Sequence, residues 1–262
     1  MLKRTILARV ATSLMLLAWA LPTAGEAGAA ETVIFRDDGR ASWQQLFKKV
    51  GLTCATATRA GPSLRITSCP VADGTSNKTA MVWALTRVSV PSFKVEFDYT
   101  HNSAVASPGG TMTGLMILAS GDGSTGYPVD VTRWGAQCCA GPTNPATGYA
   151  LRMRGLQLNF ANRFDPRGNN FIRLRGLKGA VGSYEELGAA EVPVADGRAY
   201  HVTAVRAGTR MTVSFRDNVT GTTRTLAANH PYIGTLGPGW VGIRQMPGRT
   251  SRVANLKVST GG

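Results

Sequence analysis

The stretch Ser92-Phe93-Lys94-Val95-Glu96-Phe97-Asp98-Tyr99-Thr100 decides the fold class of this 262-residue chain. Its apolar and polar residues alternate without a break. Because successive side chains of an extended strand point to opposite faces, the apolar residues share one face and the charged residues share the other. The pattern predicts a β-strand that is buried on one side and polar on the other.

Two further stretches indicate an antiparallel sheet protein. Met211 to Arg216 alternates in the same way, and Asp217 to Gly221 then supplies a turn. Gly114 to Ala119 is apolar on both faces, which is typical of a central strand. The 31 glycines and 13 prolines punctuate short apolar runs, so the chain is predicted to be an all-β antiparallel sandwich curved into a jelly roll.

One segment departs from the strand pattern. Apolar residues recur at helical spacing from Trp43 to Val50, and Gly51 follows as a stop. Ser42 and Gln45, three residues apart, can form a capping box at the start. A short helix is therefore predicted here, with its apolar stripe used for packing.

The first 30 residues are interpreted as a signal peptide. A basic head precedes an apolar run centred on residues 14–21, Pro22 ends the run, and small residues at 27–30 suit a peptidase. The run is too short to cross a bilayer, so a membrane anchor is disfavoured. We expect a secreted or periplasmic protein without a transmembrane anchor, in which residues 31–262 form a single β-sandwich domain because no linker or charge block divides them.

The chain is strongly basic. Its formal net charge is +14, and removal of the signal peptide leaves about +12 because three basic residues and one acidic residue go with it. Such a field attracts polyanions, which outside the cell include acidic polysaccharide, anionic envelope and stray nucleic acid. The alternative is that the arginine-rich balance serves only solubility.

The four cysteines are predicted to pair in an oxidising compartment. Cys54 and Cys69 flank a turn at Gly61, and folding the chain there sets them opposite each other as a structural disulfide. Cys138 and Cys139 are adjacent, and a bond between them would form a stiff apolar plate suited to a sugar ring. Reduced thiols, a bridge to the first hairpin and a bridge to another chain remain alternatives.

Long donor side chains gather on a later strand. Arg152 and Arg154 precede Gly155, and Gln157 and Asn159 follow it in the opposite phase. A bulge at Gly155 would restore the register. We expect the two arginines and the two amides to point to one face.

The next strand adds two more arginines to this predicted face. Arg173 and Arg175 alternate with apolar neighbours and so point the same way. Arginine forks suit carboxylates and amides suit hydroxyls, so this face, rimmed by Trp134 and Tyr149, is predicted to be a groove for an anionic glycan. An ordinary solvated sheet face is the alternative, disfavoured because acids are scarce here.

Four segments carry a resemblance to a known group of proteins. They are residues 95–99, residues 156–160, residues 173–179, and Gly242-Ile243-Arg244-Gln245-Met246 before the closing strand at 252–258. On these the chain resembles the concanavalin A-like sandwich proteins, and more narrowly a bacterial family found among rhamnogalacturonan (pectin) utilisation proteins. The resemblance implies a jelly roll whose concave sheet handles carbohydrate; Gln157 stands where a relative can carry histidine.

Two classes of function stay open. The first, favoured from the sequence, is an enzyme acting on a polysaccharide that is expected to be acidic. A hydrolase needs paired carboxylates, and Glu96 and Asp98 share a face, but His101 stands where the glucanase pattern has a third acid. A lyase needs arginines to neutralise a uronate and a base such as His101, Tyr149 or Tyr184. The second class is a non-catalytic glycan-binding or envelope-interaction module that uses the same face.

The candidate residues divide by role. The catalytic candidates are Asp98, His101 and Tyr149. No cofactor and no specific nucleic acid is expected, and a structural calcium ion has support only from isolated acids such as Asp122. The substrate-binding candidates are Trp134, Arg152, Arg154, Gln157, Asn159, Arg163, Arg173, Arg175, Arg244 and Gln245.

Overall fold

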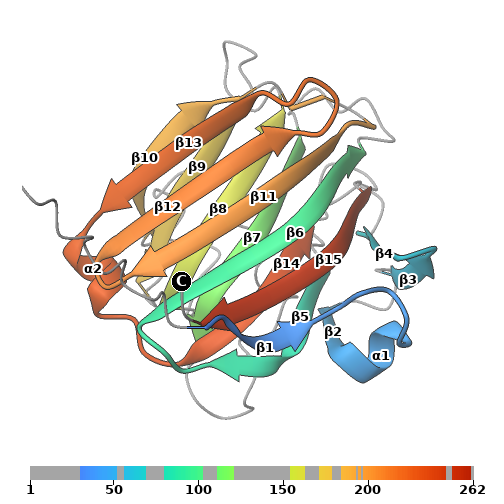
Figure 1. Cartoon of the computed structure of the whole chain (residues 1–262), viewed down its shortest axis with the longest axis horizontal. Helices are drawn as coiled ribbons and strands as arrows, with labels where there is room; N and C mark the ends of the chain where they lie inside the picture. The colour runs from blue at the N-terminus through green and yellow to red at the C-terminus, as the bar shows by residue number, and fades with distance from the viewer. Residues whose placement is uncertain are drawn as a thin grey trace, which may run out of the picture.

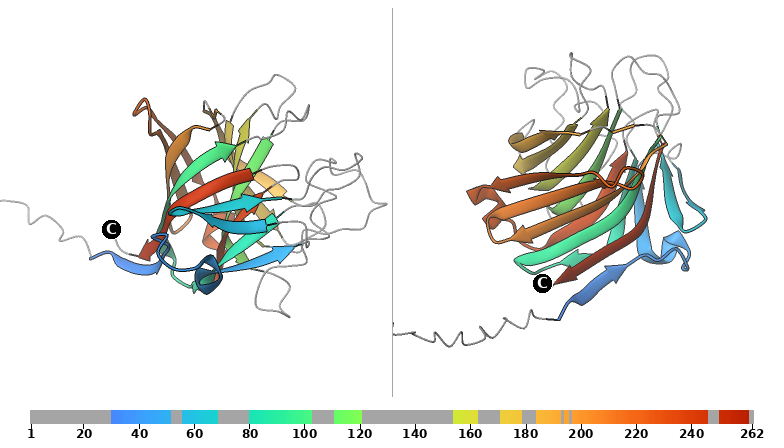
Figure 2. Two further views of the ribbon diagram at one scale, coloured as in Figure 1. Left: turned by 90° about the vertical axis from the view of Figure 1, so that its right-hand side faces the viewer. Right: turned by 45° about the horizontal axis from the view of Figure 1, so that its top comes forward.

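The computed structural model describes most of the chain after the first 29 residues. The described residues are 30–51, 56–68, 80–102, 111–120, 154–162, 171–178, 184–192, 194–195, 197–245 and 250–260. They form two antiparallel sheets, of eight and seven strands, stacked face to face (Figures 1 and 2). The predicted all-β jelly-roll sandwich is confirmed. Among the described residues, no helix is long and apolar enough to cross a membrane.

The eight-stranded sheet runs in the order β13-β12-β11-β6-β15-β4-β3, with β1 also paired to β15. The pairing of Thr32 in β1 with Thr260 in β15 brings the two described ends of the chain together (Figure 1). The strands are β1 (Thr32–Arg36), β3 (Thr56–Ala60), β4 (Ser63–Thr67), β6 (Ser92–Asn102), β11 (Ala199–Ala207), β12 (Arg210–Asp217), β13 (Thr223–Asn229) and β15 (Thr250–Thr260).

The seven-stranded sheet runs in the order β10-β9-β8-β7-β14-β5-β2. Two four-residue helices, α1 (Trp43–Leu46) and α2 (Pro231–Gly234), accompany the sheets. The strands are β2 (Phe47–Gly51), β5 (Ala80–Val88), β7 (Thr111–Ser120), β8 (Arg154–Asn162), β9 (Phe171–Lys178), β10 (Tyr184–Glu191) and β14 (Gly239–Gln245).

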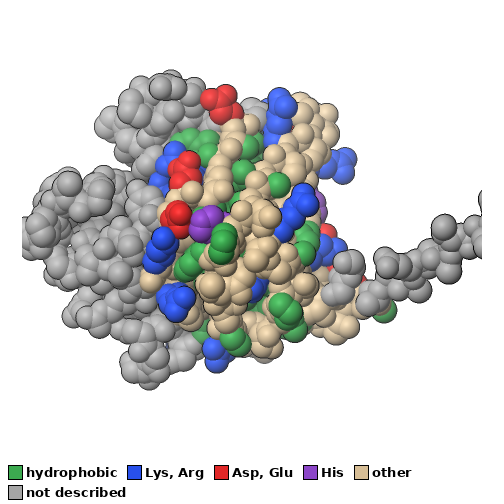
Figure 3. All heavy atoms as spheres, turned by 90° about the vertical axis from the view of Figure 1, so that its left-hand side faces the viewer, with side chains coloured by type: hydrophobic (Ala, Val, Ile, Leu, Met, Phe, Trp, Pro, Cys, Tyr) green, Lys and Arg blue, Asp and Glu red, His purple; other side chains and the backbone are tan. Residues whose placement is uncertain are grey.

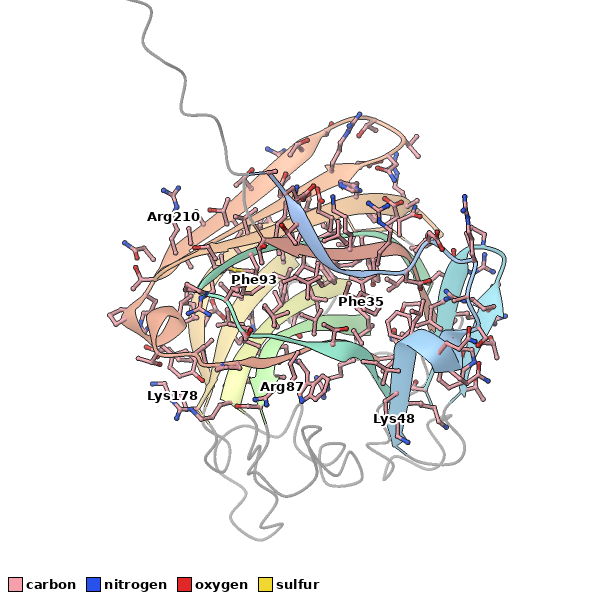
Figure 4. All side chains as sticks on the ribbon, turned by 60° about the horizontal axis from the view of Figure 1, so that its bottom comes forward. Phe35, Lys48, Arg87, Phe93, Lys178 and Arg210 are labelled. Carbon is pink, nitrogen blue, oxygen red and sulfur yellow. The ribbon has the colours of Figure 1, made fainter. Side chains whose placement is uncertain are left out.

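The core lies between the sheets, where the inward side chains of both interlock. Phe160 of the seven-stranded sheet stacks on Tyr99 and Phe215 of the other sheet, at centroid distances of 4.9 and 5.6 Å. Each such pair adds about 0.5–1.5 kcal/mol beyond burial of its area. The labelled rings of Phe35 and Phe93 point into this space, whereas Arg210 and Lys178 project away from it (Figure 4).

The predicted alternation of apolar and polar residues from Ser92 to Thr100 is confirmed in β6. Its apolar residues are at most 2% exposed, and its charged residues form the outer face. The predicted turn at Asp217 is also present, since the Asp217 carboxylate accepts hydrogen bonds from the N–H groups of Val219 and Thr220. The chain folds back between β3 and β4, as the turn at Gly61 predicts.

Two sequence-based expectations were wrong. The helix ends at Leu46, and Phe47–Gly51 is instead strand β2, paired with β5. The bulge expected in β8 at Gly155 lies in the neighbouring strand β7, where Leu118 adopts a left-handed φ of 51°. Gly155 faces this bulge so closely that a Cβ there would lie 2.9 Å from Cα of Ala119.

Candidate functional site

The amides of β8 lie on the outer face of the seven-stranded sheet. Leu156, Leu158 and Phe160 alternate with them and are at most 1% exposed in the core. Gln157 and Asn159 therefore point away from the core. The predicted common face for these two amides is present.

Strand order then brings four positions into one line across the sheet. Arg173 of β9 is opposite Asn159 of β8, Asn159 is opposite Gly114 of β7, and Gly114 is opposite Arg244 of β14. We call these four residues the outer-face row. Arg175 and Gln157 are paired two residues along the same two strands, so they flank the row on the same face.

Gly114 leaves room for the two amides. A Cβ at this position would lie 3.2 Å from Asn159 Oδ1 and 3.3 Å from Gln157 Nε2. Both side chains therefore lean over the glycine. At the centre of the row, the amides of Asn159 and Gln157 therefore lie above the backbone of Gly114, which carries no side chain.

Both amides are buried, and three of their polar atoms have no hydrogen-bond partner in the described part of the chain. Asn159 is 1% exposed and Gln157 is 3% exposed. Within the described part of the chain, Asn159 Nδ2 and Oδ1 and Gln157 Nε2 have no partner. Because each unsatisfied buried group costs about 1–3 kcal/mol, such groups are rare and call for an explanation.

The arginines of this face differ in exposure. Arg173 Nε lies 2.7 Å from Glu186 Oε2 of β10, and the Arg173 side chain is 24% exposed. Its guanidinium also stacks 4.3 Å from the centroid of the Phe171 ring. Arg175 and Arg244 are 8% and 3% exposed. The row thus reaches solvent at Arg173 and is buried at Arg244.

Two predicted binding residues lie away from the row. Gln245 follows Ile243, a core residue, at a spacing of two, which places it on the inner side of β14, where it is 1% exposed. Arg154 is exposed at the start of β8, opposite Lys178 of β9. The structure does not group either residue with the row.

Several predicted residues cannot be placed. Of His101, the structure gives the pairing of its backbone in β6 with Ser251 of β15. The remaining candidates lie outside the described residues: Trp134, Tyr149, Arg152 and Arg163, together with Cys54, Cys69, Cys138 and Cys139.

The predicted catalytic residue Asp98 lies on the opposite sheet. Its carboxylate accepts hydrogen bonds from His201 Nδ1 of β11 at 2.9 Å and from Asn255 Nδ2 of β15 at 2.7 Å. Asp98 and the amides of β8 thus occupy the two opposite outer faces of the sandwich, so the structure does not join them in one groove. We call Asp98, His201 and Asn255 the Asp98 cluster.

A network of ion pairs adjoins the Asp98 cluster. Glu31 lies 2.9 Å from Lys94 and 3.1 Å from Lys257, and it accepts a 2.6 Å hydrogen bond from Ser259. The Ser259 hydroxyl, followed by the two ammonium groups, lowers the pKa of Glu31 to about 2. Lys94 and Lys257 have raised pKa values because of their hydrogen bonds to Glu31 and Glu96. The pKa of Glu96 is lowered, since its hydrogen bonds from the two lysines outweigh the effect of partial burial.

A further group of charges lies where β10 meets the start of α2. Glu185 lies 2.9 Å from Lys178 and 3.3 Å from His230 Nε2. The hydrogen bond from Lys178 is the main cause of its lowered pKa. This side of the molecule carries acidic, basic and histidine side chains close together (Figure 3). Among the described residues, no group of three or more histidine, cysteine or acidic side chains could hold a metal ion.

Comparisons with known proteins find similarity in the fold alone. No protein-family model matches the sequence, and no curated protein matches it. A protein of unknown function with a galectin-like fold from Bacillus subtilis matches with a TM-score of 0.60 and 14% identity, over 88% of this chain and 96% of that one. The winged bean acidic lectin in complex with methyl-α-D-galactose has a TM-score of 0.58 and 14% identity, over 89% and 100%. Lectin II from Ulex europaeus has a TM-score of 0.56 and 12% identity, over 90% and 99%.

These neighbours agree with a concanavalin A-like sandwich, as the sequence resemblance implied. The narrower resemblance to the pectin-utilisation family has no support from the sequence comparisons and stays a prediction.

Proposed function

We propose that this chain is a non-catalytic glycan-binding protein whose ligand lies on the outer-face row. The observation that carries the proposal is the amide of Asn159, which is buried on an outer sheet face with both polar atoms unpartnered in the described part of the chain. A group in this state lowers the stability of the free protein. A ligand that forms hydrogen bonds with both polar atoms of Asn159 removes this destabilisation.

The chemistry of the row suits a sugar. The amides of Asn159 and Gln157 can each donate to and accept from hydroxyl groups, which do the same in return. Arg173, at the solvent-exposed end, is paired through Nε with Glu186, and the terminal nitrogens of its guanidinium suit the carboxylate of a ligand. With the basic net charge of the chain, this favours an acidic glycan.

The fold adds independent support for a binding role. The winged bean lectin of the same fold was solved with methyl-α-D-galactose bound. That ligand belongs to that protein, and the low identity transfers no residue to this chain. The complex supports only the general class of function, which is carbohydrate binding by this fold.

Catalysis has less support on this face. Glycoside hydrolysis uses two carboxylates that flank the bond to be cleaved. Of the three carboxylates in β10, Glu186 lies against Arg173 and Glu185 against Lys178, so two of them are held in ion pairs, and Glu191 lies at the far end of the strand. Asp98 lies on the other sheet. We therefore prefer the binding function to the lyase or hydrolase that the sequence favoured.

The place of action is part of the proposal. The basic head, short apolar run and small residues of positions 1–30 support export, so we propose a secreted or periplasmic protein that meets glycans outside the cytoplasm.

The proposal is tested by titrating the purified chain calorimetrically with oligogalacturonate and with methyl α-D-galactoside. We expect saturable binding, stronger for the acidic ligand, with no new reducing or unsaturated ends after prolonged incubation. Asn159→Ala is expected to weaken binding, and Gln44→Ala, an exposed amide on α1, is the matched control. Formation of products, or equal affinity for the Asn159→Ala variant and the parent, would contradict the proposal.

A further inference from the structure

The outer face of the eight-stranded sheet contains a pocket of about 400 Å³ that is lined by polar and charged residues. It is bordered by β1, β6, β11 and β15, which run side by side in the register of the sheet (Figure 1). This volume is within the range of small-ligand sites, roughly 300–1,000 Å³. The pocket is lined by Arg36, Asp37, Asp38, Glu96, His201, Asn255 and Lys257.

A bulge in β15 builds one wall of the pocket. The register with β6 shifts between Ala254 and Lys257, and Asn255 in this bulge adopts a left-handed φ of 55°. Its side chain donates to Asp98 at 2.7 Å. Bulges and left-handed non-glycine residues are costly to hold and gather at functional sites, where they aim a side chain.

The same carboxylate fixes the imidazole of His201. Because an ionised Asp98 can only accept, the His201 Nδ1 atom that lies 2.9 Å away carries the proton. In the neutral ring, Nε2 is then an acceptor. It has no partner among the described residues, and the side chain is 42% exposed. The pocket thus presents an oriented acceptor to solvent.

Most charges of the pocket are already matched by ion pairs among the described residues. Lys257 pairs with Glu96 at 2.8 Å and with Glu31 at 3.1 Å. Asp37, which also lines the pocket, accepts two hydrogen bonds from Arg59, of 2.6 and 2.8 Å. On a chain of net charge +14, this is a locally balanced region. A charged ligand would compete with these pairs at every charged lining residue except Arg36, which has no ion pair among the described residues, whereas a neutral ligand would leave the pairs in place.

We infer that this pocket is a second ligand site, distinct from the outer-face row, and that it takes a neutral sugar ring. Hydroxyl groups would donate to His201 Nε2 and to Glu96, and they would accept from Arg36 and Lys257. Donors held beside acceptors suit the adjacent hydroxyl groups of a sugar, because each hydroxyl can both donate and accept a hydrogen bond. Two sites on opposite faces of one sandwich would let a single chain bridge two glycans.

The experiment follows the ring resonances of His201 by NMR while methyl α-D-galactoside, methyl α-D-glucoside and methyl α-D-mannoside are added in turn to the Asn159→Leu variant. This variant lacks the Asn159 amide that carries the proposed function, so a shift at His201 is independent of that function. We expect a saturable shift with at least one glycoside, at a Kd of the order of 1–10 mM, where weak single-ring binding lies.

The variant Asn255→Gly tests the contribution of the Asn255 side chain to the pocket. Glycine adopts the left-handed φ without strain, so the bulge is kept while the hydrogen bond to Asp98 is lost. We expect its Kd to rise at least about tenfold, which corresponds to about 1.4 kcal/mol. The inference is overturned if none of the three glycosides shifts the His201 resonances at about 100 mM, far above such a Kd, or if Asn255→Gly binds as tightly as its parent.

Discussion

Replacing Asn159 with leucine should stabilise the free protein and abolish its binding of glycan. Leucine has nearly the shape of asparagine but lacks the polar atoms, which are buried and unpartnered in the described part of the chain. Removing an unsatisfied buried polar group is worth about 1–3 kcal/mol. For a chain of this size, each kcal/mol raises the melting temperature by about 2–4 °C.

The assay is urea denaturation followed by circular dichroism, combined with calorimetric titration of oligogalacturonate. The parent chain and Gln44→Leu, which replaces an exposed amide, serve as references, and the latter should stay within about 0.5 kcal/mol of the parent. A stability gain with loss of binding is the signature of a group held for a ligand. A fall in stability would show instead that Asn159 stabilises the free fold and is not held in reserve for a ligand.

Three further outcomes are expected. Gly114→Ala places a Cβ 3.2 Å from the Asn159 amide oxygen and should weaken glycan binding severalfold. Gly237→Ala is the control, because its Cβ would meet nothing within 4 Å. Equal affinities of the two variants would count against a role for the space that Gly114 leaves above its backbone. Arg173→Ala should raise the Kd for an acidic glycan about 10- to 100-fold, the worth of a hydrogen bond to a charged group, with the melting temperature of Arg210→Ala as reference; no preferential loss for the acidic ligand would contradict it. Glu31 has a folded pKa of about 2, below its usual 4.5, so its stabilisation is present above pH 4.5 and is lost as the pH falls towards 2. The melting temperature of Glu31→Gln should therefore lie below that of the parent at pH 7 and meet it near pH 2, and a constant difference would argue against the ion pairs.

Much of the fold could be predicted from local patterns. The alternation in residues 92–100 corresponds to β6, because strand period and burial are both properties of neighbouring residues. The helix expected up to Val50 failed because Phe47–Gly51 pairs with β5, a strand far along the chain. Tertiary pairing outweighed a weak helical pattern.

The site could be predicted only in part. Alternation placed Gln157, Asn159 and Arg173 on one face, which the structure bears out. The place of Gly114 at the centre of the row depends on strand order, and Arg244 joins it for the same reason. Sequence spacing alone carries no such information.

The Asp98 cluster shows the same limit more sharply. His201 lies across from Asp98 because β11 pairs with β6 in that register. Alternation with buried neighbours could have placed His201 on an outer face, although without its partner. Asn255 reaches Asp98 because of the bulge in β15. A glycine within a strand often marks a bulge, but none stands at this position of the sequence.

The proposed function depends on binding of a glycan by the amides of Asn159 and Gln157. The most direct measurement follows the side-chain amide cross-peaks of Asn159 and Gln157 in ¹⁵N-labelled protein during titration with oligogalacturonate. If the amides bind the glycan, both cross-peaks should move together and saturate, and the Arg173 Nε signal should follow the same curve. Cross-peaks of Asn159 and Gln157 that stay in place while other residues report binding would contradict it.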